Sequence, residues 1–365
     1  MKFIRQVFLD KIFLCSFLVA ICTLTLGFPQ QRDIDWQTIE SLFTLMLAVQ
    51  IFQFLGVFAR ISEFLTKYVK MARNLVELFV FMAFFSSMIL TNDVVLLTLI
   101  PILAMILTRS CINHVYPVVL ICLSANLGSS LLPLGNPQNL FLFTFYHLSF
   151  QTFLEMGLPV CFISLILLCV ACYKVSKIRI RIPSFALQTI PISQLSISIL
   201  ASIAALAGIL RFISLSAAMI VTILSAFLIS PKIFKHVDYS LLLTFICFFV
   251  AVSDIKHLPI LSHVLKMLNT SQRGVYLSSL GLSQLLSNVP TAVLWAPFSP
   301  HYYAIFLGTN IGGLGTIIAS LANLLAYKQY RINFPEEHTS YLKTFAFFNL
   351  LFLLILGTLG FFLIQ

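Results

Sequence analysis

Polar side chains and glycines interrupt this apolar sequence in two regions, and they follow the same order in each half of the chain. The first region contains Thr91-Asn92-Asp93 and then Asn126, Gly128 and Asn139; the second contains Ser287-Asn288 and then Asn310, Gly312 and Asn323. The separation in sequence from Asn126 to Asn310 is repeated without change between the two glycines and between the two later asparagines, and we call it the repeat spacing. Amide and hydroxyl groups can bind either an anion or a cation. Such interruptions at corresponding places in two apolar halves are typical of the central binding site of a repeat-built transporter.

The first element of each region predicts a helix start. Thr91-Asn92-Asp93 and Ser287-Asn288 precede apolar runs, as N-cap residues do, and Pro290 follows the second pair. Unpaired N–H groups and the positive end of the helix dipole favour an anion at such a position. The predicted ligand residues here are Thr91, Asn92, Asp93, Ser287, Asn288 and Thr291.

The second element of each region cannot form one continuous helix. Residues 126–139 contain two prolines and two glycines, and residues 310–323 contain three glycines. Irregular backbone at membrane depth is tolerated where it is buried or lines a cavity, and its carbonyl groups can then bind Na⁺. The predicted ligand residues here are Asn126, Gly128, Ser129, Asn136, Asn139, Asn310, Gly312, Thr316 and Asn323, and the Na⁺ candidates are Asn92, Asp93, Asn139, Asn288 and Asn323. We expect Asn139→Ala or Asn323→Ala to weaken ligand binding and leave folding largely intact.

Asp93 is the only charged side chain in these motifs, because residues 115–154 and 274–327 contain no Asp, Glu, Lys or Arg. A carboxylate at membrane depth is costly and is a functional candidate, although it could also cap the helix. Without a neighbouring Lys or Arg, a bound polyanion needs a co-bound cation: Na⁺ on amides and carbonyls, or H⁺ on Asp93. The same fact leaves open that the cation is itself the substrate.

The composition excludes a soluble globular protein, because 60% of the 365 residues are hydrophobic and only 9% are charged. Since a helical crossing needs about 20 apolar residues, nine crossings are predicted: 12–28, 41–59, 115–145, 153–173, 190–210, 213–230, 239–254, 302–327 and 342–364. Residues 74–109 and 274–299 are predicted re-entrant hairpins. The expected fold is an all-α polytopic membrane protein with inverted repeats at 1–183 and 184–365, each with a broken helix (115–145 and 302–327) at the midplane.

The distribution of basic residues predicts the orientation. With the N-terminus inside and the C-terminus outside, 17 of the 22 Lys and Arg lie on the inner side, and the exceptions are Arg32, Arg211, Lys256, Lys266 and Arg273. The net charge of +10 is therefore a membrane signature, and no basic domain supports a nucleic-acid partner. Short amphipathic stretches before each hairpin (Ile61, Phe64, Leu65 and Tyr68; Leu261, Val264, Leu265 and Leu268) predict helices at the membrane interface.

Thr91-Asn92-Asp93-Val94, Leu134-Gly135-Asn136-Pro137-Gln138-Asn139 and Ser287-Asn288-Val289-Pro290-Thr291 resemble the ion transporter superfamily, in its branch of citrate-transporter-like, arsenite-pump and sodium/proton-antiporter-like anion permeases. The resemblance implies a scaffold and a mobile transport domain, often in a homodimer, with elevator-like movement. In its dicarboxylate-transporting members a Ser-Asn-Thr motif at each hairpin tip helps to bind carboxylate and Na⁺. This chain has Asp93 and Val289 in place of the third residue, which weakens the case for a dicarboxylate.

These observations predict a permease for a small carboxylate or inorganic oxyanion, coupled to Na⁺ or H⁺, in a bacterial cytoplasmic membrane. A Na⁺/H⁺ antiporter is the alternative, because Asp93 is the one carboxylate in the motifs. An intramembrane enzyme is a third and weaker alternative. No cofactor is expected, since the eight Cys lie mostly within apolar segments rather than in a metal-ligand or redox pattern.

Overall fold

The computed structural model describes residues 11–24, 33–109, 112–180, 190–255, 267–269 and 271–364. These residues are helical wherever they are regular, apart from one isolated β-bridge between Met71 and Arg179. The helices before residue 180 are α2 (Lys11–Thr23), α3 (Trp36–Phe54), α4 (Val57–Thr66), α5 (Ala72–Ile89), α6 (Asn92–Arg109), α7 (Val115–Gly128), α8 (Pro137–Phe145) and α9 (Phe150–Cys172). Those after it are α10 (Ile192–Ile209), α11 (Leu215–Ile229), η2 (Pro231–His236), α12 (Tyr239–Ile255), α14 (Gln272–Leu286), α15 (Asn288–Trp295), η3 (Ala296–Phe298), α16 (Tyr302–Gly312), α17 (Leu321–Asn333), η4 (Pro335–Glu337) and α18 (His338–Leu363).

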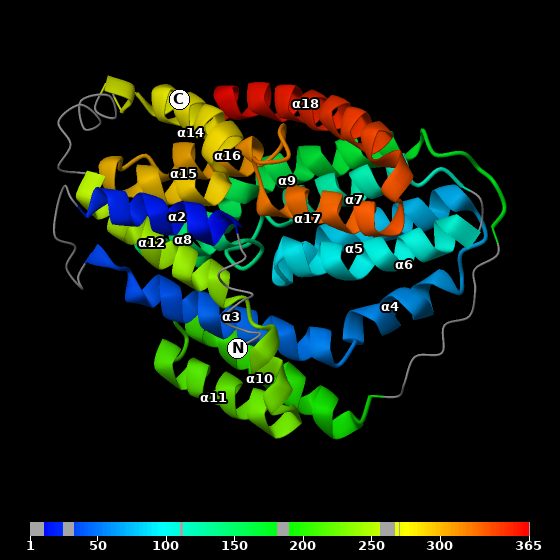
Figure 1. Ribbon diagram of the computed structural model, residues 1–365, viewed down its shortest axis with the longest axis horizontal. Coiled ribbons are helices and arrows are strands. Elements are labelled where there is room, and N and C mark those ends of the chain that lie inside the picture. The colour runs from blue at the N-terminus through cyan, green and yellow to red at the C-terminus, as the bar shows by residue number, and fades with distance from the viewer. Residues whose placement is uncertain are drawn as a thin grey trace.

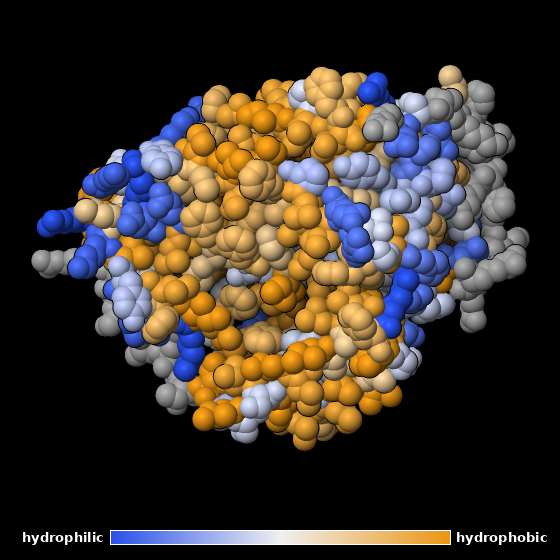
Figure 2. Space-filling view, turned by 180° about the vertical axis from the view of Figure 1, so that it is seen from behind, coloured by the Kyte–Doolittle hydropathy of each residue, from blue (hydrophilic) through white to orange (hydrophobic). Residues whose placement is uncertain are grey.

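The surface and the helix lengths identify a polytopic membrane protein. Among the described residues, α5, α9, α10 and the segment Pro335–Leu363 are each long and apolar enough to cross a bilayer, and α3 with α4 passes the same test as a bent pair. Large apolar side chains face outward on several helices; Ile192 is 83% exposed and Leu228 is 75% exposed. Figure 2 shows this apolar surface, with hydrophilic residues gathered at its two lateral ends. An apolar belt between polar ends fits a hydrocarbon core between two aqueous sides.

Helices occur in all nine stretches predicted to cross the membrane, but the number of crossings stays a prediction. The predicted interfacial helix before the first hairpin is present as α4, which meets α3 at an angle of 52°. Gly56 lies at this bend with φ +65°, a conformation that favours glycine, so the sequence explains the change of direction. Leu261, Val264 and Leu265 of the second amphipathic stretch lie outside the described residues.

The helices pack in two groups. The first helix group consists of α2, α3, α10, α11, η2 and α12, and the second consists of α5 to α9 and α14 to α18. Figure 1 shows α10 and α11 along one edge of the molecule, with α18 along the opposite edge. Contacts of α3 with α8, of α12 with α15, and of α4 with α5 and α6 join the groups. The site described below lies within the second group and where the two groups meet.

Each predicted interruption is present in the backbone. The hairpin helices α5 and α6 pack against each other around a short turn at Leu90-Thr91, and α14 meets α15 at Ser287. Residues 129–136 separate α7 from α8, and residues 313–320 separate α16 from α17. The two breaks therefore have equal length and are related by the repeat spacing.

Candidate functional site

The tip of each hairpin is bonded to the break in its own half of the chain. The backbone N–H of Asn92, the first residue of α6, donates to the carbonyl oxygen of Gly135 at 3.1 Å. The backbone N–H of Asn288, the first residue of α15, donates to Ala319 at 2.9 Å. Gly135 and Ala319 are related by the repeat spacing, so the two tips contact equivalent positions of the breaks although Asn92 and Asn288 are themselves farther apart in sequence than this spacing.

The predicted helix starts are confirmed, but one predicted cap is wrong. Ser287 precedes α15, yet its hydroxyl accepts no hydrogen bond from a backbone N–H of that helix. Its φ of +77° turns the side chain away, and the hydroxyl donates instead to the side-chain oxygen of Asn288 or to the carbonyl of Ala319. The start of α8 does have a side-chain cap: Asn136 Oδ1 accepts from the N–H of Asn139 at 2.9 Å, with Pro137 at the first helical position.

Four asparagines of the two broken helices bond directly across the two halves. Asn126 Nδ2 donates to Asn323 Oδ1 at 2.6 Å, and Asn310 Nδ2 donates to Asn139 Oδ1 at 2.7 Å. The two donors, Asn126 and Asn310, are related by the repeat spacing, and so are the two acceptors, Asn139 and Asn323. All four residues are at least nine-tenths buried. The amide groups are therefore paired with one another, which fixes the two breaks side by side.

Three further hydrogen bonds extend this polar network. Ser320 Oγ donates to Asn126 Oδ1 at 3.1 Å, and its counterpart Asn136 donates through Nδ2 to Asn310 Oδ1 at 3.1 Å. Asn92 Nδ2 also donates to Asn126 Oδ1, at 3.2 Å, which connects the first hairpin tip to the network. The name polar network is used below for Asn92, Asn126, Asn136, Asn139, Asn310, Ser320 and Asn323.

The same side chains hold the unwound backbone. Asn139 Nδ2 lies 3.1 Å from the carbonyl oxygen of Ser129 and also within reach of those of Ser130 and Leu132. Asn323 Nδ2 donates in the same way to Gly313 and Thr316, both at 2.9 Å. Several predicted ligand groups are thus used internally in this structure, as donors and acceptors within the breaks.

Other predicted ligand residues have contacts of a different kind. Gly128 and Gly312 permit close helix packing: a Cβ on Gly128 would overlap the carbonyl oxygen of Phe84, and one on Gly312 would lie 2.8 Å from the Cβ of Ser283. The hydroxyl of Thr291 donates to the carbonyl of Ser287 at 2.8 Å. Ser129 Oγ donates to the carbonyl of Asn126 at 2.8 Å, and Thr316 is exposed and bonds to Gln284.

A cavity of about 830 Å³ leads to the first hairpin tip from one end of the molecule. At its inner end are Thr91 and Asp93, together with Pro137 and Leu321, the first residues of α8 and α17. Asp93 Oδ1 is buried and has no hydrogen-bond partner among the residues that the structure describes. The starts of three helices therefore border one cavity that also holds a single motif carboxylate. Such starts carry unsatisfied N–H groups and partial positive charge.

Charged side chains that the motif analysis did not select line the same cavity. Lys235 and His236 come from η2, Asp238 from the start of α12, and Lys328 from α17. Lys235 and Lys328 are exposed side chains. From the sequence, these lysines indicate only the inner side of the membrane. Their position in one cavity with Asp93 depends on the packing of helices that are far apart in the chain.

Two other cavities also lie where the two helix groups meet. One, of about 450 Å³, is lined by Asp33, Asp35 and His147 together with apolar residues of α8, α12 and α15. The other, of about 500 Å³, is apolar apart from Ser86 and Ser202 and lies between α3, α4, α5 and α10. The contact between the two groups is therefore incompletely packed at several places.

Comparison with known proteins identifies the family. A profile described as citrate transporter matches residues 7–303. The inner membrane protein YbiR of Escherichia coli is 31% identical over 300 residues, which cover 81% of this chain and 80% of that protein. The uncharacterized transporter MJ0456 of Methanocaldococcus jannaschii is 32% identical over 326 residues, covering 87% and 88%. The putative transporter arsB of Dictyostelium discoideum is 31% identical over 147 residues, covering 39% of this chain and 26% of that protein. These matches confirm the resemblance to anion permeases: the chain belongs to the citrate transporter family.

Proposed function

We propose that the protein is a secondary active transporter that moves a small carboxylate or inorganic oxyanion together with a cation, Na⁺ or H⁺. The observation that carries this proposal is the cavity that is bordered by the starts of α6, α8 and α17 and by the Asp93 side chain. Helix N-termini attract anions, and Lys235 and Lys328 add positive charge along the route to them. The names of the relatives, two of which are called transporters, agree with a transporter rather than an enzyme.

Asp93 supplies a physical reason for coupling. An ionised carboxylate beside the helix starts repels an incoming anion, whereas a carboxylate that has bound H⁺ or Na⁺ does not. Two like unit charges about 4 Å apart repel by about 4 kcal/mol at an effective dielectric constant of about 20. Repulsion of that size changes affinity by roughly a thousandfold, so anion binding would require the cation. Na⁺ bound by Asn92, Asn139, Asn288 or Asn323 is the other arrangement that the sequence predicts.

The proposed movement is of the elevator type, in a fold built from two inverted repeats. Equal contacts support the repeats: both breaks and both pairs of bridging asparagines obey the repeat spacing, and each hairpin tip bonds to the equivalent residue of its break. The cavities where the two helix groups meet support displacement of one group along the other. In this proposal the first helix group is the scaffold, and the second carries the polar network and the hairpin tips.

The orientation follows from the basic residues. With Lys235 and Lys328 on the cytoplasmic side, the cavity at Asp93 faces inward, the N-terminus is inside and the C-terminus is outside. The name of the YbiR relative suggests the bacterial inner membrane as the location. A homodimer stays a prediction of the family resemblance.

A Na⁺/H⁺ antiporter is the second candidate, and one observation favours it: Asp93 Oδ1 is buried beside the cavity, with no hydrogen-bond partner in the described part of the chain. An antiporter of this kind would load Na⁺ and H⁺ alternately on that carboxylate. If Asp93→Asn retains Na⁺-dependent H⁺ flux in proteoliposomes, this alternative is refuted.

Ligand-dependent unfolding tests the proposed function. Purified protein would be heated with citrate, succinate, sulfate, phosphate or arsenite, each with and without Na⁺ and at two pH values. A ligand present at about 100 times its dissociation constant adds about 2.7 kcal/mol of stability, which is measurable. We expect an anion that stabilises the protein only with Na⁺ or at the lower pH. Stabilisation by Na⁺ or Li⁺ alone, with no anion effect, would contradict the anion permease and favour the antiporter.

A further inference from the structure

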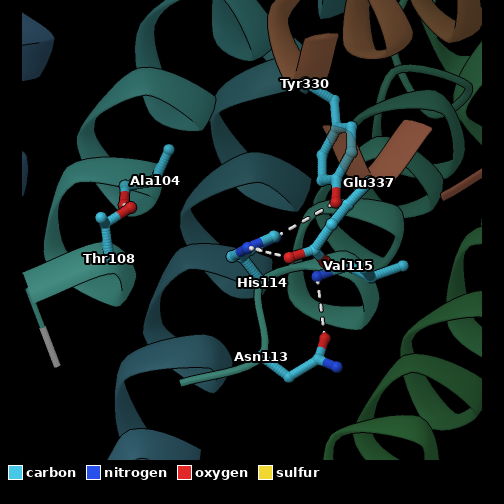
Figure 3. Close-up of polar contacts among 7 residues, drawn as sticks. All are labelled: Ala104, Thr108, Asn113, His114, Val115, Tyr330 and Glu337. Carbon is cyan, nitrogen blue, oxygen red and sulfur yellow. Dashed lines mark hydrogen bonds and ion pairs between the residues drawn. The ribbon is translucent and has the colours of Figure 1, made fainter. Parts of the chain in front are cut away.

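Two tyrosines join the second part of each broken helix to the opposite half of the chain. Tyr146 directly follows α8, and its hydroxyl lies 2.6 Å from the carbonyl oxygen of Ser299 and 3.0 Å from that of Ala296, between α15 and α16. Tyr330 lies near the end of α17, and its hydroxyl is 3.1 Å from Nδ1 of His114, between α6 and α7. Figure 3 shows Tyr330 and Glu337 converging on His114. Tyr146 and Tyr330 are related by the repeat spacing, so the contacts are counterparts.

The surroundings of His114 make its contact different from that of Tyr146. The His114 ring stacks on Phe334 with centroids 3.4 Å apart, and its Nε2 lies 3.6 Å from Glu337 Oε1. The His114 side chain is 12% exposed and that of Glu337 is 54% exposed. The side-chain oxygen of the neighbouring Asn113 accepts a hydrogen bond from the first backbone N–H of α7. Among the described residues, the titratable groups that face His114 are the Tyr330 phenol from α17 and the Glu337 carboxylate from η4 (Figure 3).

Protonation of His114 changes what Tyr330 can do. In the neutral His114 tautomer that carries its hydrogen on Nε2, Nδ1 accepts a hydrogen bond from the phenol and Nε2–H points toward Glu337. When Nδ1 is protonated, the phenol oxygen must accept instead, and its own hydrogen loses its acceptor in a fully buried position. Burial lowers the pKa of His114, with partial opposition from Glu337, which agrees with a preference for the neutral ring. The carbonyl partners of Tyr146 do not titrate.

Both contacts act on the helices that border the cavity. The first residues of α8 and α17, Pro137 and Leu321, line its inner end, and the tyrosines lie at or near the other ends of these helices. At 1.5 Å per residue, α8 is a rod only about 14 Å long, so fixing one end limits the tilt at the other. A phenol contact at one end of the rod thus sets the direction of the N–H groups at the cavity.

We propose that Tyr146 and Tyr330 are equivalent positioning residues for the anion site, and that acid weakens the Tyr330 contact through His114 while leaving the Tyr146 contact intact. This inference rests on the proposed function, because it assumes that an anion binds at the starts of α8 and α17. It adds a residue pair outside the motifs and an acid sensitivity in one half only.

Removal of single hydroxyl groups tests the positioning role. We expect Tyr146→Phe and Tyr330→Phe each to raise the half-saturating anion concentration about threefold to tenfold, with a smaller change in maximal rate. Hydrogen exchange without substrate should become faster in residues 129–136 for Tyr146→Phe and in residues 313–320 for Tyr330→Phe. Tyr116→Phe is the matched control: it loses a phenol bond of 2.8 Å to the carbonyl of Ala171, away from both breaks, and should change neither measurement.

Two variants of His114 test the acid sensitivity. His114→Asn keeps an acceptor near Nδ1 that cannot take up a proton, and His114→Phe keeps the stacking but removes the acceptor. When the pH is lowered from about 7.5 to about 5.5, we expect wild type to lose anion affinity and to show faster hydrogen exchange in residues 313–320, and we expect neither change in His114→Asn. His114→Phe should behave like Tyr330→Phe at both pH values. If Tyr330→Phe has the same anion affinity and the same hydrogen exchange as wild type, the inference is overturned. If the hydrogen exchange changes as expected but the protein transports no anion, the proposed function is overturned and the contacts of the two tyrosines are not.

Discussion

Replacing Asn323 by alanine should destabilise the protein itself, in addition to any effect on ligand binding. Its Oδ1 accepts from Asn126 Nδ2 at 2.6 Å, and its Nδ2 donates to the carbonyls of Gly313 and Thr316 at 2.9 Å. Hydrogen bonds between membrane helices contribute about 0.6 kcal/mol on average and up to about 1.7 kcal/mol. Loss of three such bonds therefore predicts a decrease of about 2–5 kcal/mol in the free energy of unfolding. The sequence-based expectation of largely intact folding overlooked this network.

Asn349→Ala is the matched control for this experiment. Asn349 is equally buried, but its Nδ2 donates only to the carbonyl of Phe345 in its own helix, and its Oδ1 has no partner. Its replacement should cost less than about 1 kcal/mol. Unfolding in mixed micelles, followed by circular dichroism, would compare the variants, and Asn139→Ala should match Asn323→Ala because its contacts are equivalent. The reasoning is refuted if Asn323→Ala is no less stable than Asn349→Ala.

Three further perturbations follow from the geometry. Gly128→Ala should lower the free energy of unfolding by about 1–3 kcal/mol because its methyl group would overlap the carbonyl of Phe84. Gly281→Ala would place its methyl group where no packed neighbour lies within 4 Å, so it should be neutral or raise the free energy of unfolding by up to about 1 kcal/mol; thermal unfolding compares the two variants. Burial lowers the pKa of His114, so the unfolded chain takes up a proton before the folded protein does as the pH falls below about 6.5. The free energy of unfolding of wild type should therefore decrease below this pH, and that of His114→Asn should decrease less, as measured by unfolding at a series of pH values. Lys235→Gln and Lys328→Gln should slow initial anion uptake and reduce its dependence on ionic strength; wild-type salt dependence would contradict their role in the cavity.

Much of the helical fold could be predicted, because it depends on local signals. The breaks follow from prolines and glycines, the start of α8 from Asn136 and Pro137, and the membrane environment from composition. The equal spacing in the two halves also indicated which residues would occupy equivalent positions. These are properties of short segments, so neighbouring residues determine them.

The contacts between the halves could not be predicted, because they depend on how distant segments pack. Asn126 donates to Asn323 of the other half, and the repeat spacing alone identifies equivalent residues but not their partners. Lys328 was interpretable only as a charge on the inner side until packing placed it in the cavity with Asp93. Tyr146 and Tyr330 do share the repeat spacing, so a search for repeated residues of every type would have found them.

Gradient-driven uptake of labelled anions into proteoliposomes tests the central claim most directly. Wild type and Asp93→Asn would be compared with citrate, succinate, sulfate, phosphate and arsenite under imposed Na⁺ and pH gradients. The account predicts that wild type accumulates at least one anion in response to a cation gradient, and that Asp93→Asn exchanges this anion across the membrane without accumulating it. Failure of wild type to move any of these anions under either gradient, or full accumulation by Asp93→Asn in response to a pH gradient, would contradict coupling of anion transport through Asp93.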